Sequence, residues 1–132
     1  MSPNESRRNR RIILRWTLAI LYAAGLFVVS STPGSDLPQL KMGDKLLHAL
    51  AFGGLAVLIC RALRAQKPAW SQRAVAVLGV LAAVAYGCFD ESYQSFVSER
   101  RAELSDVVAD GVGALLAGWG WNKAAKPWGW LR

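Results

Sequence analysis

Hydrophobic positions along the chain fall into four blocks, each close to the length that crosses a membrane. These blocks cover residues 12–31, 46–63, 73–89 and 104–121. A bilayer core of about 30 Å needs about 20 helical residues, with a range of about 17–25. The third block is apolar on all sides and so lacks the polar face that a helix of a soluble bundle would show. The pattern therefore predicts an all-α fold, a membrane bundle of four transmembrane helices.

The first block follows a basic segment, residues 1–11, and so needs to be distinguished from a signal peptide. Its apolar stretch is longer than the ~7–15 residues of a signal core, and no A-x-A-like cleavage site follows it. We therefore expect a retained first helix. The membrane domain then covers residues 12–121, between the basic N-terminus and a basic, tryptophan-rich tail at residues 122–132.

Basic residues dominate the net charge and orient the predicted bundle. The chain has 132 residues, of which 53% are hydrophobic, and its 16 basic and 9 acidic residues give a net charge of +7. If four helices alternate, most basic residues and all six tryptophans lie on the side of the two termini. The positive-inside rule and the aromatic belt place that side in the cytoplasm. We expect a multi-pass protein of the bacterial inner membrane with N-in/C-in topology. Its basic residues would contact the lipid bilayer and bind no nucleic acid.

Acidic residues show the opposite distribution. Apart from Glu5, they lie at the outer ends of the predicted helices or in outer loops, namely Asp36, Asp44, Asp90, Glu91, Glu99, Glu103, Asp106 and Asp110. An ionisable group inside a membrane helix is costly and usually marks a functional site. Asp110, about 9 Å below the start of its helix, should therefore point into the bundle or a wet cavity. This distribution predicts an acidic pocket in the outer leaflet.

Three residues of this outer face are candidates for proton transfer. Asp44 and His48 are four residues apart and share a helix face, so Asp44 would orient His48. Glu91 ends an apolar helix, where desolvation suits a carboxyl group to acid–base work. It would exchange protons with His48. Glu91, His48 and Asp44 are therefore the predicted catalytic residues.

Five further polar residues are predicted to bind a substrate, namely Lys45, Gln94, Arg100, Asp106 and Asp110. Arg100 would hold an anionic headgroup through paired hydrogen bonds. Asp106 and Asp110 lie one turn apart, and because two carboxylates repel each other, a cation is expected beside them. Lys45, Arg100, protonated His48 or a metal ion would each serve. The same groups would equally serve as structural ion pairs that hold short helices together.

Known cofactor and metal motifs are missing from the sequence. The spacing of His48 and the acids matches no specific metal motif. The chain also lacks a serine nucleophile elbow, an H-E-x-x-H helix, a Walker loop and a C-x-x-C pair. We therefore predict no bound metal and no cofactor. The two cysteines, Cys60 and Cys88, fall at opposite ends of the predicted helices, so we expect no disulfide.

Small residues recur at four-residue spacing in the last two helices. Ala83 and Gly87 form one such pair, and Ala109, Gly113 and Ala117 form a longer ridge. Ridges of this kind let helices approach closely in lipid. They predict tight packing inside the bundle, or a face through which two copies of the chain form a homodimer.

Three short motifs carry a family resemblance. Residues 43–52 contain D-K-x-x-H, residues 90–97 contain D-E-x-x-Q-x-F, and Arg100 is followed by Asp106, Asp110 and Gly113. Their combined spacing resembles the VanZ-like family across residues 12–121. The chain departs from the family pattern at Ser98-Glu99, where Pro-Gly is usual, and at Asp110, where Asn is common.

The resemblance implies a small multi-span inner-membrane protein, from a family named for low-level teicoplanin resistance. We expect a pocket that binds or modifies an envelope component, either a lipid-linked precursor or a lipid headgroup, with a link to glycopeptide resistance. The alternative is a non-catalytic membrane scaffold, or a surface-shielding protein, whose ion pairs are structural.

Overall fold

Four long helices account for most of the chain that the structure describes. The computed structural model describes residues 2–36 and 43–124. In chain order the elements are α1 (Pro3–Ser30), η1 (Gly34–Asp36, a 3-10 turn), α2 (Asp44–Gln66), α3 (Gln72–Gln94) and α4 (Leu104–Ala124). These residues contain no strand. The predicted all-α class and the four helices are therefore confirmed.

The helices extend beyond the predicted apolar blocks. α1 begins at Pro3 rather than at residue 12, because Ser2 and Glu5 form a reciprocal capping box. The Glu5 amide donates to Oγ of Ser2 at 3.2 Å, and the Ser2 amide donates to the Glu5 carboxylate at 2.7 Å. The basic N-terminal segment is thus helical. Part of the predicted tail continues α4 to Ala124, and residues 125–132 lie outside the described residues.

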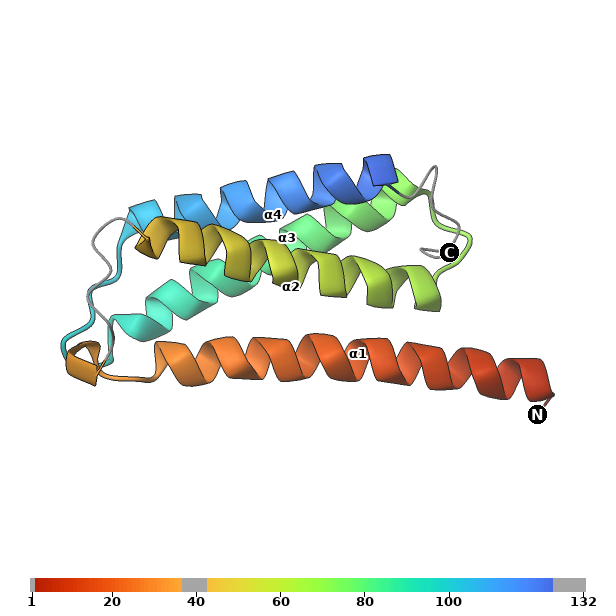
Figure 1. Ribbon diagram of the computed structural model, residues 1–132, viewed down its shortest axis with the longest axis horizontal. Helices are drawn as coiled ribbons and strands as arrows, with labels where there is room; N and C mark the ends of the chain where they lie inside the picture. Colours follow the sequence, from red (N-terminus) through yellow and green to blue (C-terminus); the bar gives the residue numbers. More distant parts are fainter. Residues whose placement is uncertain (1, 37–42, 125–132) are drawn as a thin grey trace.

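Successive helices run antiparallel, so the start of α1 and the end of α4 lie at the same end of the bundle (Figure 1). α4 packs mainly on α2 and α3, whereas α1 lies along α2 and barely contacts α3. The central core is formed by Phe52, Leu55, Ala56, Ala83 and Ala114. α2 is therefore the element against which all other helices are placed.

Small residues make the contact between α2 and α4 close. A Cβ atom at Gly113 would overlap the backbone of Ala49, and one at Gly53 would lie 3.1 Å from the Gly113 carbonyl oxygen. The predicted small-residue ridge thus packs inside the bundle. A homodimer stays a prediction. Gly111 lies on another face of α4, where a Cβ atom would meet nothing within 4 Å and would point into open space.

Tyrosine hydroxyls attach α1 to the rest of the bundle. Tyr22 donates to the carbonyl oxygen of Ala51 at 3.0 Å, and Tyr86 donates to that of Ala23 at 2.7 Å. Each bond satisfies a hydroxyl that would be costly to leave without a partner in an apolar bundle. These contacts fix the position of α1 beside the first half of α2.

Three helices, α1, α2 and α3, are long and apolar enough to cross a membrane. α4, with two aspartates in its first two turns, is not among them. The fourth span and the N-in/C-in orientation therefore stay predictions. Both cysteines are free thiols, with Cys60 buried and Cys88 exposed.

Candidate functional site

Buried polar side chains gather at the end of the bundle where α1 and α3 end and α2 and α4 begin (Figure 1). They are Ser30, Asp90, Glu91, Gln94, Asp106 and Asp110. The antiparallel order of the helices brings these distant sequence positions together. This end is the candidate site.

His48 on α2 pairs with Asp110 on α4. The Nδ1 atom of His48 lies 2.8 Å from Oδ1 of Asp110, whose side chain is only 1% exposed. An ionised carboxylate is an acceptor only, so Nδ1 carries the proton that is donated to Asp110. Gly87 of α3 makes room for this acid, because a Cβ there would lie 2.8 Å from Oδ2 of Asp110. The pair holds the imidazole at a fixed tautomer and leaves Nε2 available.

This pairing gives His48 a different carboxylate partner from the predicted one, Asp44. The helix face that Asp44 shares with His48 predicts that Asp44 orients the imidazole. Its side chain is instead 56% exposed at the start of α2, and its ion-pair partner is Lys45 at 4.0 Å. The orienting carboxylate is Asp110, because α4 packs directly over His48 while the first turn of α2 is open to solvent.

Lys45 is the cation that the acidic cluster needs. Its ammonium group contacts Asp106 and lies 2.9 Å from Oε2 of Glu103. Glu103 precedes α4, and its hydrogen bonds from Lys45 and Ser105 lower the pKa of its carboxyl group. Lys45 and Asp106 thus tie α2 to the start of α4.

A metal ion would compete with Lys45 for this place. Single ligand atoms of Asp44, His48 and Asp106 all lie within 4.8 Å of one another. Oxygen and imidazole donors suit several divalent metals. However, Lys45 already supplies positive charge to Asp106 and stands near Asp44. Lys45 is one cation beside three carboxylates, those of Asp44, Glu103 and Asp106, and the absence of a metal stays a prediction.

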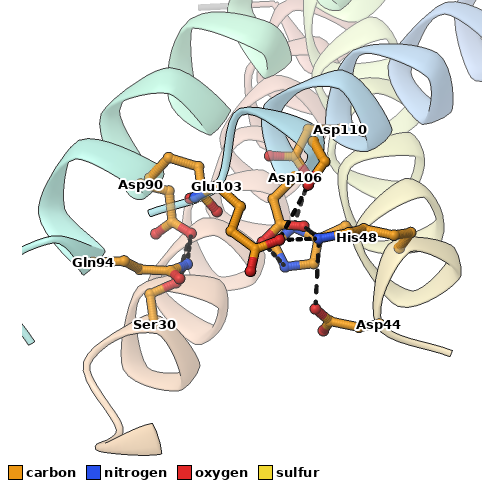
Figure 2. A network of polar contacts seen from close by, with 11 residues as sticks. Ser30, Asp44, His48, Asp90, Gln94, Glu103, Asp106 and Asp110 are labelled. Carbon is orange, nitrogen blue, oxygen red and sulfur yellow. Dashed lines mark hydrogen bonds and ion pairs between the residues drawn. The ribbon is translucent and has the colours of Figure 1, made fainter. Parts of the chain in front are cut away.

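Ser30, Asp90 and Gln94 form a second polar group, opposite His48 (Figure 2). The Ser30 hydroxyl donates to Oδ2 of Asp90 at 2.6 Å, and the Gln94 amide donates to the same oxygen at 3.0 Å. The sequence predicts Gln94 as a binding residue but neither Ser30 nor Asp90. The spacing of Asp90 and Gln94, one helical turn, is the signal available for Asp90. No spacing within one helix could place Ser30 of α1 beside them.

Glu91, the predicted acid, faces away from this group. It is 4% exposed, and its Oε2 atom accepts a hydrogen bond from the Glu103 amide at 3.1 Å. Consecutive residues point about 100° apart around a helix, so Asp90 and Glu91 meet different neighbours. Glu91 holds the segment that leads into α4. Its Oε1 atom has no hydrogen-bond partner among the described residues.

A cavity of about 260 Å³ lies between the two polar groups. Its polar lining consists of Ser30, Asp44, His48, Asp90, Gln94 and Arg100, and its apolar lining of Leu26, Val29, Leu47, Ala51 and Phe52. Of the predicted site residues, Asp44, His48, Gln94 and Arg100 therefore line one cavity. The other four predicted residues do not line this cavity, namely Lys45, Glu91, Asp106 and Asp110.

The loop that carries Arg100 is fixed against η1. The Gly34 amide donates to the Ser98 carbonyl oxygen at 3.2 Å, and the Arg100 amide donates to that of Val97 at 3.2 Å. Between them Glu99 has a φ of 58°, in the left-handed region that glycine adopts most easily. Arg100, which follows this turn, lines the cavity.

Apolar helices of membrane-spanning length around a cavity with a partly polar lining define a class of protein, the small helical membrane proteins with a buried polar site. The family model described as VanZ/LLP1 matches residues 2–124. The chain therefore belongs to the VanZ/LLP1 family and is a membrane protein. No curated protein and no solved structure matches it.

Proposed function

We propose that this VanZ-family protein binds the headgroup of an amphiphilic envelope component, a lipid-linked precursor or a phospholipid, in the cavity beside His48. The observation that supports this proposal is the composition of the cavity. Charged and hydrogen-bonding side chains form one part of its lining, and apolar side chains of α1 and α2 form the rest. Sites of this composition bind ligands that are partly polar and partly apolar.

The size of the cavity favours a headgroup rather than a whole lipid. Its volume of about 260 Å³ equals the liquid volume of about nine water molecules. Pockets for drug-sized ligands have volumes of about 300–1,000 Å³. The acyl or prenyl chains would therefore lie outside the cavity, along the exposed apolar surface that Val28 and Val29 of α1 and Leu46 and Leu50 of α2 provide.

Charge distribution supports an outer-leaflet location for the cavity. A groove at the opposite end of the bundle is lined by five arginines from α1 and α2, namely Arg7, Arg8, Arg11, Arg15 and Arg64. By the positive-inside rule this end belongs in the cytoplasm. The acidic end then faces outward, where envelope components are assembled and glycopeptides act.

Proton transfer at the bound headgroup is a second candidate function, and the His48–Asp110 pair favours it. A buried carboxylate that fixes Nδ1 of a histidine leaves Nε2 free to act as a general base, the arrangement found in hydrolases. Nε2 of His48 lies 3.9 Å from Oδ2 of Asp106. The predicted exchange with Glu91 is less favoured, because Glu91 does not line the cavity.

Cavity filling tests the binding proposal. In Ala51→Phe a large ring would enter the cavity, and crosslinking of photoactivatable phospholipids or polyprenyl phosphates to the purified full-length protein should fall at least fivefold. Ala85→Phe adds the same ring to an exposed position of α3 and should leave crosslinking unchanged. Equal crosslinking in both variants would contradict the proposal and leave the scaffold or surface-shielding alternative.

The catalytic candidate has a separate test. A strain that lacks this protein should accumulate the substrate in a profile of lipids and envelope precursors, and wild-type protein should reverse the accumulation. If His48→Gln restores the profile as well as wild type does, proton transfer is excluded while binding stands. Teicoplanin sensitivity of the same strains tests the link to glycopeptide resistance.

A further inference from the structure

Two oppositely charged groups that line the cavity each have a buried polar atom without a partner. Asp90 is 2% exposed, and its Oδ2 atom accepts from Ser30 and Gln94. Its Oδ1 atom has no hydrogen-bond partner among the described residues. A buried carboxylate oxygen is costly without a donor. Oδ1 of Asp90 is therefore available to accept a hydrogen bond from a ligand bound in the cavity.

Arg100 shows the complementary feature. Its Nε atom is buried and has no hydrogen-bond partner, and no acid within 4.0 Å forms an ion pair with it in the part of the chain that the structure describes. Arg100 lines the same cavity as Asp90. Since a guanidinium group binds phosphate oxygens through paired N–H donors, Arg100 is prepared to hold a phosphate.

The remaining charges of the cavity restrict the ligand further. Asp44 adds a second carboxylate to the lining, whereas Asp106 and Asp110 do not line the cavity and have partners of their own in Lys45 and His48. A ligand that carries only negative charge would satisfy Arg100 but would be repelled by Asp44 and Asp90. A ligand that carries only positive charge would leave Arg100 without a partner.

We propose that the cavity selects an amphiphile whose headgroup carries a primary ammonium group and a phosphate diester, the chemistry of an aminoethyl phospholipid. The ammonium group would donate to Oδ1 of Asp90, with Asp44 nearby, and the phosphate would lie against Arg100. A quaternary ammonium has no N–H and cannot satisfy Asp90, so a choline headgroup would bind less well. This inference rests on the proposed function, since it names the headgroup that the cavity would hold.

Lipids that differ only in the headgroup test the inference. The full-length protein in detergent would be titrated with phosphatidylethanolamine, phosphatidylcholine and phosphatidylglycerol of the same acyl chains, with native mass spectrometry as the readout. The ethanolamine lipid should bind at least tenfold more tightly than either of the others. Free O-phosphoethanolamine, added as a competitor, distinguishes a lipid ligand from a soluble one. It should compete only at concentrations far above that of the lipid, whereas equal competition would overturn the choice of an amphiphile.

Two variants with matched controls assign the selectivity to residues. Asp90→Asn should remove the preference for ethanolamine over choline, whereas Asp36→Asn, an exposed acid at the same end, should keep it. Arg100→Gln should weaken binding of all three phospholipids, whereas Arg101→Gln, the exposed neighbour, should not. If Asp90→Asn does not fold, two comparisons still test the inference: Arg100→Gln against Arg101→Gln, and the three phospholipids against one another.

Failure of this inference can be told from failure of the proposed function. Equal binding of the three lipids, or tighter binding of phosphatidylglycerol, would overturn the headgroup assignment. Loss of that binding in Ala51→Phe would still support the cavity as a lipid site. If none of the phospholipids or polyprenyl phosphates binds, both proposals fail.

Discussion

His48 and Asp110 show how a single buried contact defines this site. The two side chains come from different helices, and Asp110 lies in the interior with 1% of its side chain exposed. A buried carboxylate is stabilised only by partners that hydrogen-bond to its charged form. For Asp110 that partner is the His48 ring. The charge of one residue therefore depends on the presence of the other.

Removal of the Asp110 charge should lower the free energy of unfolding. Asp110→Asn keeps the size of the side chain and an acceptor oxygen for His48 but removes the negative charge. We expect a loss of about 1 kcal/mol in the free energy of unfolding, the difference between a hydrogen bond to a charged group and one to a neutral group. Unfolding in detergent measures it, and Asp36→Asn is the exposed control. Nitrogen NMR should also show His48 protonated at Nδ1 in the wild type, and a different tautomer there would contradict the pairing.

Glu99 has a backbone conformation that is unfavourable for any residue with a Cβ atom. Its φ of 58° lies in the left-handed region, where a non-glycine residue costs about 1–2 kcal/mol. The VanZ-like pattern usually has glycine in this turn. Glu99→Gly should therefore raise the free energy of unfolding by about 0.5–1 kcal/mol, after the entropy cost of glycine itself. A melting temperature below that of wild type would contradict this account of the turn.

At the level of the helices, the contact between α2 and α4 positions the site. His48 and Lys45 of α2 meet Asp110 and Asp106 of α4 because Gly113 lets the two helices approach closely. Close approach through small residues is a general device of membrane helices.

Two glycines of α4 allow the effect of helix packing on stability to be measured separately from the effect of helix propensity. Gly113→Ala would place a methyl group on the backbone of Ala49 and should destabilise the protein by about 1–3 kcal/mol. Gly111→Ala meets open space, so it should be neutral or stabilising by up to about 1 kcal/mol, because alanine favours helix. Unfolding in detergent compares the two variants. Equal effects would show that α4 is not held against α2 in this way.

At the scale of the whole molecule, the two ends of the bundle have opposite character. Arginines of α1 and α2 line a groove at one end, and buried acids gather at the other. By the positive-inside rule this asymmetry predicts the orientation, because translocation of basic segments is disfavoured. The predicted orientation would bring the cavity to the outer surface, so the orientation and the proposed function depend on each other.

Alkaline-phosphatase fusions test the orientation. A fusion after Glu99 should be active, because that loop is predicted to be outside, and a fusion after Pro68 should be inactive. A fusion after Ala124 should also be inactive if α4 completes a fourth crossing. Activity after both Glu99 and Ala124 would show that α4 does not cross, and the reverse pattern at Glu99 and Pro68 would overturn the N-in orientation.

Much of this architecture could be predicted because it depends on local sequence. Apolar length sets the positions of the helices, and charge patterning separates acids from bases along the chain. Helical spacing also identifies most of the polar residues at the outer end. Of these, Asp44, His48, Gln94 and Arg100 line one cavity. Their predicted roles in binding and catalysis stay predictions.

The sequence by itself determined the four helices, the separation of charge and the resemblance to the VanZ-like family. Only the tertiary structure decided that Asp110 rather than Asp44 holds His48, that Asp90 and Ser30 belong to the cavity, and that Glu91 does not. The physical reason is that spacing within one helix determines which side chains share a face. Which faces meet depends on how the helices rotate and cross, and here close contacts such as that of Gly113 with Ala49 determine the crossing.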